Sequence, residues 1–203
     1  MKFEKLDINK HDLDKVSKWI YETELSIFRP LLGNDKYEAT KNMKKLVMAD
    51  NTLFSHEHIY VVNDSSENLL GILVSFCGRE TSIWNDFKAY FKILNLYEFL
   101  KYVVKGTLVN EMLTASVGKN DYYLSNIAVD TSYRGQGLGT YILENAFAVA
   151  KNKGCKRVIL DVTFNNVGAS RLYERFGFKV YGKKVPKLIF NGKGTYNMEH
   201  FVD

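Results

Sequence analysis

The chain has 203 residues, a length that suits one well-buried globular domain because domains usually run to about 100–200 residues. Hydrophobic residues make up 46% and charged residues 25%, which excludes disordered, collagenous and fibrous classes. Lys and Arg number 28 against 23 Asp and Glu, and the resulting net charge of +5 favours an anionic ligand without specifying one. We therefore expect a single domain over residues 1–203.

The two cysteines, Cys77 and Cys155, belong to different segments, so they provide neither a disulfide framework nor a four-ligand zinc site. We interpret both as inert core thiols, and a reducing compartment fits them best. The N-terminal residues lack an apolar signal-peptide core, and no stretch approaches the roughly 18 apolar residues of a membrane span. We expect a cytoplasmic protein with no membrane partner and no nucleic-acid partner, because the Lys-rich stretches 151–157 and 183–187 carry no nucleic-acid motif.

In chain order, the first part of the sequence predicts a strand, two helices and a hairpin. Apolar residues alternate over 2–8, and helical spacing begins at Leu13 with His11 or Asp12 as its cap. Breaks at Arg29-Pro30 and Gly33-Asn34 precede the second helix. The apolar face of that helix comprises Tyr37, Met43, Leu46 and Val47, and the hairpin pairs strands 58–62 and 69–76.

Residues 79–118 form an aromatic insert, since seven of the 19 residues from Trp84 to Tyr102 are Trp, Tyr or Phe. Apolar residues at helical spacing predict two helices that are joined near Asn95. Three interpretations remain open for this insert: a helical pair packed on the core, a lid over an acceptor site, or the interface of a homodimer. Buried aromatic anchors suit each of them.

The second half alternates between strands and helices and contains no linker or repeat. Gly154 and Gly177 end its two helices. The predicted elements are strand 122–129, helix 137–152, strand 157–162, helix 167–176, and the final strands 178–181 and 195–201.

A glycine-rich loop lies between strand 122–129 and the helix that follows it. Gly135, Gly137 and Gly139 stand at alternate positions in this loop, next to Arg134. Glycines let backbone amides approach a ligand closely, and amides at a helix N-terminus converge where the helix dipole favours negative charge. We therefore expect a phosphate or pyrophosphate to bind there, with Arg134 as a further donor.

Two other phosphate-binding motifs fail on spacing. The dinucleotide fingerprint needs a third glycine at position 140 or 142, where this chain has Thr140 and Ile142, although Asp161 falls where its ribose-binding acid is expected. The P-loop needs a Lys followed by Ser or Thr at a fixed distance from a glycine, and that pair is missing.

The sequence resembles the GCN5-related N-acetyltransferases, whose acetyl-CoA motif is Arg or Gln, two residues, Gly, one residue, and Gly or Ala. Residues 134–139 match this motif fully, and the resemblance is firm over about 121–178. Thr131 stands where the family often has Pro, and 79–118 has no counterpart in the family's minimal fold. Further agreement comes from Ile127-Ala128-Val129, Asn166, Ala169, Leu172-Tyr173-Glu174 and Gly177-Phe178.

The resemblance implies an α/β (α+β) fold with a mixed, mostly antiparallel twisted sheet that is flanked by helices. The sheet would be splayed between its two central strands, 122–129 and 157–162. The implied activity is the transfer of an acetyl group from acetyl-CoA to a primary amine, by direct attack in a ternary complex. The acceptor stays open among a small-molecule amine, a peptide N-terminus and a lysine, and the alternative is a non-catalytic CoA-binding sensor or scaffold.

The resemblance also implies site residues. Tyr173 would protonate the CoA sulfur, and a backbone N–H of strand 127–129 would polarise the thioester carbonyl. Without the motif, Asn166 would be read as a helix cap and Tyr173 as a core aromatic. The implied cofactor-binding residues are Ile127, Ala128, Val129, Arg134, Gly135, Gln136, Gly137, Leu138, Gly139, Thr140, Asn166 and Tyr173.

The general base remains unassigned at this level. Glu111 and Asp121 are candidates by position alone, and a chain of water molecules would serve equally well. No metal is expected, because His56 and His58 share one face at a strand entry and have no third ligand nearby.

Overall fold

The computed structural model describes the chain except for residues 34, 98, 101–102, 104–114, 186–193 and 203. The described residues form one seven-stranded sheet in the order β1-β2-β3-β4-β5-β7-β6. Its strands are β1 (Lys2–Lys5), β2 (Ile59–Asn63), β3 (Leu69–Cys77), β4 (Asp121–Val129), β5 (Arg157–Thr163), β6 (Lys179–Lys184) and β7 (Thr195–Phe201).

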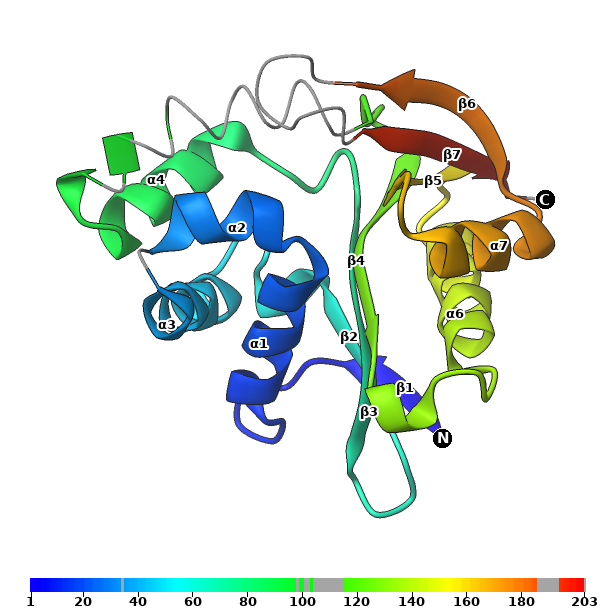
Figure 1. Ribbon diagram of the computed structural model, residues 1–203, viewed down its shortest axis with the longest axis horizontal. Coiled ribbons are helices and arrows are strands. Elements are labelled where there is room, and N and C mark those ends of the chain that lie inside the picture. Colours follow the sequence, from blue (N-terminus) through cyan, green and yellow to red (C-terminus); the bar gives the residue numbers. More distant parts are fainter. Residues whose placement is uncertain (34, 98, 101–102, 104–114, 186–193, 203) are drawn as a thin grey trace.

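Neighbouring strands pair antiparallel, with β4 and β5 as the single parallel pair among them. Helices cover both faces of the sheet: α1, α2 and α3 lie on one side, and α6 and α7 lie on the other (Figure 1). The helices are α1 (Leu13–Thr23), α2 (Leu25–Leu32), α3 (Lys36–Met48), α4 (Ile83–Ile93), α6 (Leu138–Asn152) and α7 (Val167–Phe176). The predicted mixed, mostly antiparallel sheet flanked by helices is therefore confirmed.

The hydrophobic core lies on both faces of the sheet, and every residue of β2 and β3 is buried. Because side chains of a strand alternate between faces, Ile59 and Val61 pack in the cluster under α1 and α3. Tyr60 and Val62 pack in the cluster under α6 and α7. Double coverage explains why these strands are apolar at consecutive positions.

Two predictions about the N-terminal helices are wrong. Pro30 lies inside α2 instead of ending a helix, and Phe28, Leu31 and Leu32 of that helix are buried in the core. Burial of this apolar face offsets the backbone hydrogen bond that a proline cannot donate. Tyr37 is 77% exposed, because it lies in the first turn of α3 outside the buried face, which comprises Ala39, Asn42, Met43, Leu46 and Val47.

The aromatic insert is only partly core. Tyr90, Leu94 and Phe99 are buried in the cluster that contains α3, as the packed-pair interpretation predicts. Trp84 is 73% exposed, however, and Phe91 is 60% exposed. The second predicted helix has helical backbone at residues 96–97, 99–100 and 103, and its remaining positions lie outside the described residues. The lid and dimer interpretations remain predictions.

Candidate active site

The two central strands, β4 and β5, separate part of the way along their length. They pair in register from Asp121 with Arg157 to Leu124 with Leu160, and the pairing ends there. Beyond this point β4 stays paired with β3 as far as Val129, while β5 stays paired with β7. A bulge in the β3–β4 register falls at the same place, between Leu124 and Asn126, and bulges bend and twist a strand. The predicted splay is confirmed.

A cleft of about 1200 Å³ occupies the splay and continues over the N-terminus of α6. Because β4 has no described strand partner on its β5 side beyond Leu124, the backbone groups of residues 125–129 on that side face the cleft without a ladder hydrogen bond. The predicted cofactor-binding residues that line it are Ile127, Ala128, Val129, Arg134, Gly135, Gly137, Leu138, Gly139, Thr140, Asn166 and Tyr173. The structure therefore brings together residues that the sequence placed in three separate segments.

The glycine-rich loop has the conformation that its composition predicts. Gly135 (φ 75°) and Gly137 (φ 83°) are left-handed, and Gly137 is the N-cap of α6. A Cβ at either position would meet no atom within 4 Å, so open space borders the loop. At Gly139 a Cβ would lie 2.7 Å from Leu172 Cδ2, which shows that this glycine permits close packing of α6 on α7.

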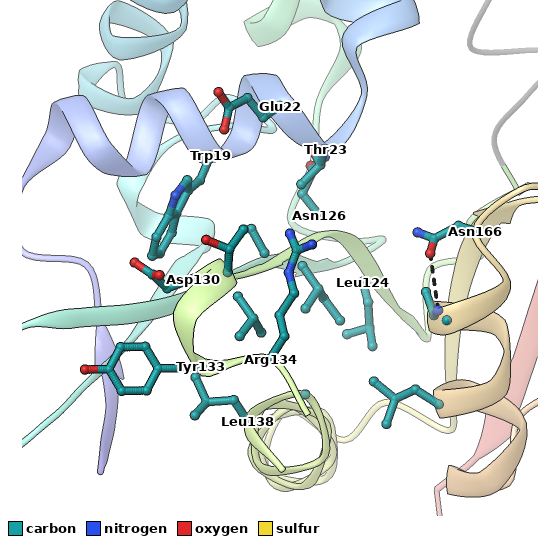
Figure 2. Close-up of a pocket in the computed structure, with 18 of the residues that line it drawn as sticks. Trp19, Glu22, Thr23, Leu124, Asn126, Asp130, Tyr133, Arg134, Leu138 and Asn166 are labelled. Carbon is teal, nitrogen blue, oxygen red and sulfur yellow. Dashed lines mark hydrogen bonds between the residues drawn. The ribbon is translucent and has the colours of Figure 1, made fainter. Parts of the chain in front are cut away.

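The side chains of Arg134 and Gln136, both in this loop, point in different directions and differ in their hydrogen bonds. The Arg134 side chain is exposed and forms no hydrogen bond or ion pair with the described residues. It extends from its loop toward the helix that carries Trp19 and Glu22 (Figure 2). Gln136 instead turns back, its Nε2 donating to the Ser132 carbonyl at 3.1 Å, and it is not among the residues that line the cleft.

Asn166 and Tyr173 border the cleft from the α7 side. The Asn166 side-chain oxygen accepts from Ala169 N at 3.2 Å and caps α7, as the dashed line in Figure 2 shows. The Tyr173 ring packs against Phe178, with ring centroids 5.8 Å apart. Burial raises the pKa of Tyr173 to about 12, and its hydroxyl has no hydrogen-bond partner among the described residues. Both are thus structural parts of α7 that also reach the cleft.

Among the carboxyl groups that line the cleft, Glu24 and Asp161 interact through their charges, and neither was predicted as a site residue. Glu24 lies between α1 and α2, and Asp161 lies on β5 just beyond its last pair with β4. Burial and the charge of Asp161 raise the pKa of Glu24 to about 7. Burial also raises the pKa of Asp161, despite hydrogen bonds from the Ala115 N–H, Tyr123 and Asn197. Neither residue belongs to a local motif, so the sequence carried no signal for this pairing.

Of the two predicted candidates for the base, Asp121 is not among the residues that line the cleft. Asp121 lies at the closed end of β4, where Arg157 binds it through Nε at 2.9 Å and Nη2 at 2.7 Å. Burial acts to raise the pKa of Asp121, but the hydrogen bonds from Arg157 and from Gly118 N lower it overall. Asp121 is therefore a structural ion-pair partner. Glu111 lies outside the described residues.

The remaining polar candidates form no metal site within the part of the chain that the structure describes, where no group of three His, Cys, Asp or Glu could hold a metal ion. His58 is buried, and burial lowers its pKa. The sheet brings the two cysteines together, with Cys155 Sγ 3.1 Å from Cys77 Sγ, although they are far apart in sequence. Among the described residues, no helix is long and apolar enough to cross a membrane.

Comparison with known proteins identifies the family that this fold and cleft define. Residues 34–178 match the Acetyltransferase (GNAT) family, and this match spans most of the chain. The chain therefore belongs to the GNAT family. The match reaches well before residue 121, where the firm resemblance in the sequence began.

Individual relatives agree with this assignment. The chain is 32% identical over 74 residues to N-alpha-acetyltransferase 30 of Schizosaccharomyces pombe, covering 36% of this chain and 49% of that protein. It is 39% identical over 72 residues to the spermine/spermidine N(1)-acetyltransferase of Bacillus subtilis, covering 35% of this chain and 45% of that protein. The matched segment thus spans about half the length of these relatives.

A solved structure shares the whole fold. An N-acetyltransferase from Staphylococcus aureus Mu50 superposes with a TM-score of 0.74 at 18% sequence identity. The superposition covers 98% of this chain and 100% of that chain. At this identity the likeness establishes the fold alone.

Proposed function

We propose that this protein is an acetyl-CoA-dependent N-acetyltransferase that transfers the acetyl group directly to an amine in a ternary complex. One observation carries the proposal: a single continuous cleft joins the glycine-rich loop to the half of β4 whose β5-facing edge is unpaired. A phosphorylated ligand with a long peptide-like arm needs both parts. Acetyl-CoA has this shape, and the family match supports its use here.

The chain's residues fit such a ligand from end to end. Arg134 is a cation with no described partner, and the loop amides before α6 complement a pyrophosphate. Free backbone groups of β4 at residues 127–129 would bind the amide groups of the arm as an added strand does. Asn166 uses its side-chain oxygen to cap α7, which leaves its amide nitrogen as a donor toward the cleft.

Bound acetyl-CoA supplies an acetyl thioester, and the protein supplies its polarisation and protons. A backbone N–H of β4 would donate to the thioester oxygen and stabilise the charge that develops there. Tyr173 would deliver a proton to the sulfur, because its hydroxyl has no described partner and lines the cleft. With its pKa raised to about 12, Tyr173 is always protonated near neutrality but is a weak acid.

Binding of acetyl-CoA tests the first half of the proposal. At a concentration of about 100 times the dissociation constant, the ligand should stabilise the fold by about 2.7 kcal/mol. For a chain of this length, that corresponds to a rise in Tm of roughly 5–10 °C. A Tm that does not change with millimolar acetyl-CoA would contradict the proposal.

Turnover tests the second half. The relatives carry names that specify different amines, so the panel should contain spermidine, a lysine peptide with a blocked N-terminus, and a peptide with a free N-terminus. We expect acetyl-CoA-dependent release of thiol with at least one of them, and mass spectrometry should show an acetylated amine. Binding without turnover on any amine would instead favour a sensor or scaffold.

A further inference from the structure

Glu24 has an unusual environment for a carboxyl group. Its backbone is non-helical (φ −141°, ψ 55°), because α1 ends and α2 begins at this residue. The side chain does not cap α2, and it forms no hydrogen bond or ion pair with the residues that the structure describes. It is half-buried and borders the cleft. A desolvated carboxyl without a partner costs stability, so its presence indicates a role in binding or chemistry.

A short chain of hydrogen bonds fixes Glu24 beside the splay. Asn126 Nδ2 donates to Thr23 Oγ1 at 2.7 Å, and Thr23 Oγ1 donates to the Ile20 carbonyl at 2.6 Å. Asn126 is buried and belongs to the open half of β4, next to the bulge. The junction that carries Glu24 is therefore tied to the strand that, under the proposed function, holds the acetyl group.

Asp161 supplies a fixed negative charge on the opposite wall. Its Oδ2 accepts from Ala115 N and from the Tyr123 hydroxyl, both at 2.8 Å, and its Oδ1 accepts from Asn197 Nδ2. These donors stabilise the carboxylate form and hold its position. The charge of Lys184 on β6 acts on Asp161, whereas Glu24 has no Lys or Arg partner among the described residues. The two carboxyls therefore lie together in the cleft next to the β4 bulge.

These observations define one arrangement, which rests on the proposed function. We propose that Glu24 is the general base of acetyl transfer, and that Asp161 is the fixed anion that attracts the acceptor as an ammonium ion. The donors to both oxygens of Asp161 favour its charged form, while Glu24 has no described partner and can exchange a proton. Neither role requires a residue of the CoA-binding loop.

The chemical step balances with these groups alone. The Glu24 carboxylate takes one proton from the ammonium, which leaves a neutral amine with a lone pair. The nitrogen then forms a bond to the acetyl carbonyl carbon, and the bond from that carbon to sulfur breaks with its electron pair going to sulfur. The Tyr173 hydroxyl gives its proton to the sulfur, and the second proton of the nitrogen passes through solvent to restore the Tyr173 hydroxyl. Glu24 finally releases its proton to solvent.

The arrangement also restricts the class of acceptor. An ammonium group is attracted by the two carboxyls, whereas a carboxylate next to the amine would be repelled by Asp161. We therefore expect alkylamines, polyamines and amines within a peptide to be acetylated. Free α-amino acids should be poor acceptors by comparison with their amides, which lack the carboxylate charge.

The pH dependence follows from the groups that face Glu24. These are Asp161 on β5 and Tyr123 on β4, while Glu22 precedes it on α1 and pairs with Lys36 at 2.7 Å. Because the pKa of Glu24 is raised to about 7, the carboxyl becomes protonated below pH 7 and cannot accept a proton from the ammonium. The value of kcat/KM should therefore fall as the pH decreases through about 7.

The deciding variant is Glu24→Gln, which keeps the shape of the side chain and removes its charge. With the most active amine of the panel at pH 8, we expect kcat/KM to fall at least about a hundredfold and the acid limb of the pH profile to disappear. Affinity for acetyl-CoA should stay within about twofold, because Glu24 lies away from the loop. Glu144→Gln is the matched control on the exposed face of α6 and should leave both constants unchanged.

Asp161→Asn separates the two roles. It should raise KM for the charged amine about tenfold, and it should move the acid limb to lower pH because a negative neighbour of Glu24 is lost. A ¹³C NMR titration of the Glu24 carboxyl measures the same change without an acceptor. A carboxyl that titrates in the ordinary glutamate range, near 4.3, would overturn the assignment of Glu24.

The outcomes distinguish this inference from the proposed function. A folded Glu24→Gln variant that keeps kcat/KM within about threefold and retains the acid limb overturns the role of Glu24, and acetyl transfer still stands. Wild-type protein that binds no acetyl-CoA, or that acetylates none of the panel, overturns the proposed function and the base assignment with it.

Discussion

The two halves of the β4–β5 strand pair carry an aspartate each, and these aspartates have opposite environments. At the closed half, Asp121 accepts two hydrogen bonds from Nε and Nη2 of Arg157, and its pKa is lowered. At the open half, Asp161 accepts hydrogen bonds from neutral donors, and burial raises its pKa although the charge of Lys184 acts to lower it. The charge of Asp121 is balanced by a guanidinium that contacts it directly. Asp161 forms no such bidentate ion pair with the described residues and faces the cleft, where a ligand could bind.

The comparison shows how one pair of strands serves both stability and function. Paired backbone groups and a bidentate ion pair hold the closed half together, so its polar atoms are satisfied internally. The open half lacks the β4–β5 ladder and the bidentate ion pair, which is costly for folding but provides binding groups. Substitutions in each half should therefore affect different measurements.

Removing the cation of the closed half should have the largest effect. Arg157→Ala leaves Asp121 and Glu199 without their partner, and we expect a loss of about 3 kcal/mol, since the pair is only partly exposed. Thermal unfolding should show a decrease in Tm of about 6–12 °C. Arg171→Ala, an exposed arginine on α7, is the control and should change Tm little.

The pH dependence of the stability lost in Arg157→Ala tests whether the ion pair with Asp121 causes that loss. The folded pKa of Asp121 is lowered, so its contribution is fully present above the unfolded value of about 3.9 and is lost as the pH falls through the folded pKa. The difference in stability between wild type and Arg157→Ala should therefore shrink below about pH 4. A difference that stays constant to pH 2 would contradict the ion-pair explanation.

Tyr173→Phe tests the chemistry of the open half. We expect kcat to fall about a hundredfold, equivalent to about 2.7 kcal/mol, because the proton donor for the sulfur is lost. The effect should lie near the lower end for general acids, since Tyr173 with a pKa of about 12 is a weak acid. Stability should change little, because the hydroxyl has no described partner and the ring remains.

A single-turnover experiment makes that result decisive, because it isolates the chemical step from product release. Tyr37→Phe removes a hydroxyl from an exposed tyrosine on α3 and is the matched control. An unchanged single-turnover rate in Tyr173→Phe would remove Tyr173 from the catalytic residues and leave it as a core aromatic.

Arg134→Ala should affect ligand affinity alone. The side chain is exposed and has no described partner, so the free energy of unfolding should change by less than about 0.5 kcal/mol. Affinity for acetyl-CoA, measured by calorimetric titration, should fall about tenfold or more, because a hydrogen bond between charged groups is lost. Equal affinity in Arg134→Ala and in the Arg171→Ala control would exclude Arg134 from the anion site.

Trp84→Ala should have the smallest effect of these substitutions on stability and on acetyl-CoA affinity. Trp84 belongs to neither half of the strand pair, does not line the cleft, and is 73% exposed. We expect the free energy of unfolding to change by less than about 0.5 kcal/mol in chemical denaturation, with acetyl-CoA affinity unaltered. A loss of several kcal/mol would show that this surface is covered in solution.

Much of the architecture could be predicted because its signals are local. Asp12 caps α1 as its position before an apolar periodicity predicts, and Asn166 and Gly177 bound α7 at the expected residues. The loop from Arg134 to Gly139 could be predicted from its glycines, because Gly135 and Gly137 have left-handed backbone that favours glycine. Pro30 and Tyr37 misled local reasoning, since burial elsewhere on their helices decides the outcome.

Local sequence patterns predicted most of the elements, the glycine-rich loop and the resemblance that implied the sheet, because neighbours in the chain carry that information, but they missed helix α2. Only the tertiary structure decided that β4 and β5 part after Leu124 and that Glu24 and Asp161 share the space between them. It also decided that Asp121 is occupied by Arg157. Such contacts join residues far apart in the chain, and they depend on the register and twist of the sheet, which no local pattern encodes.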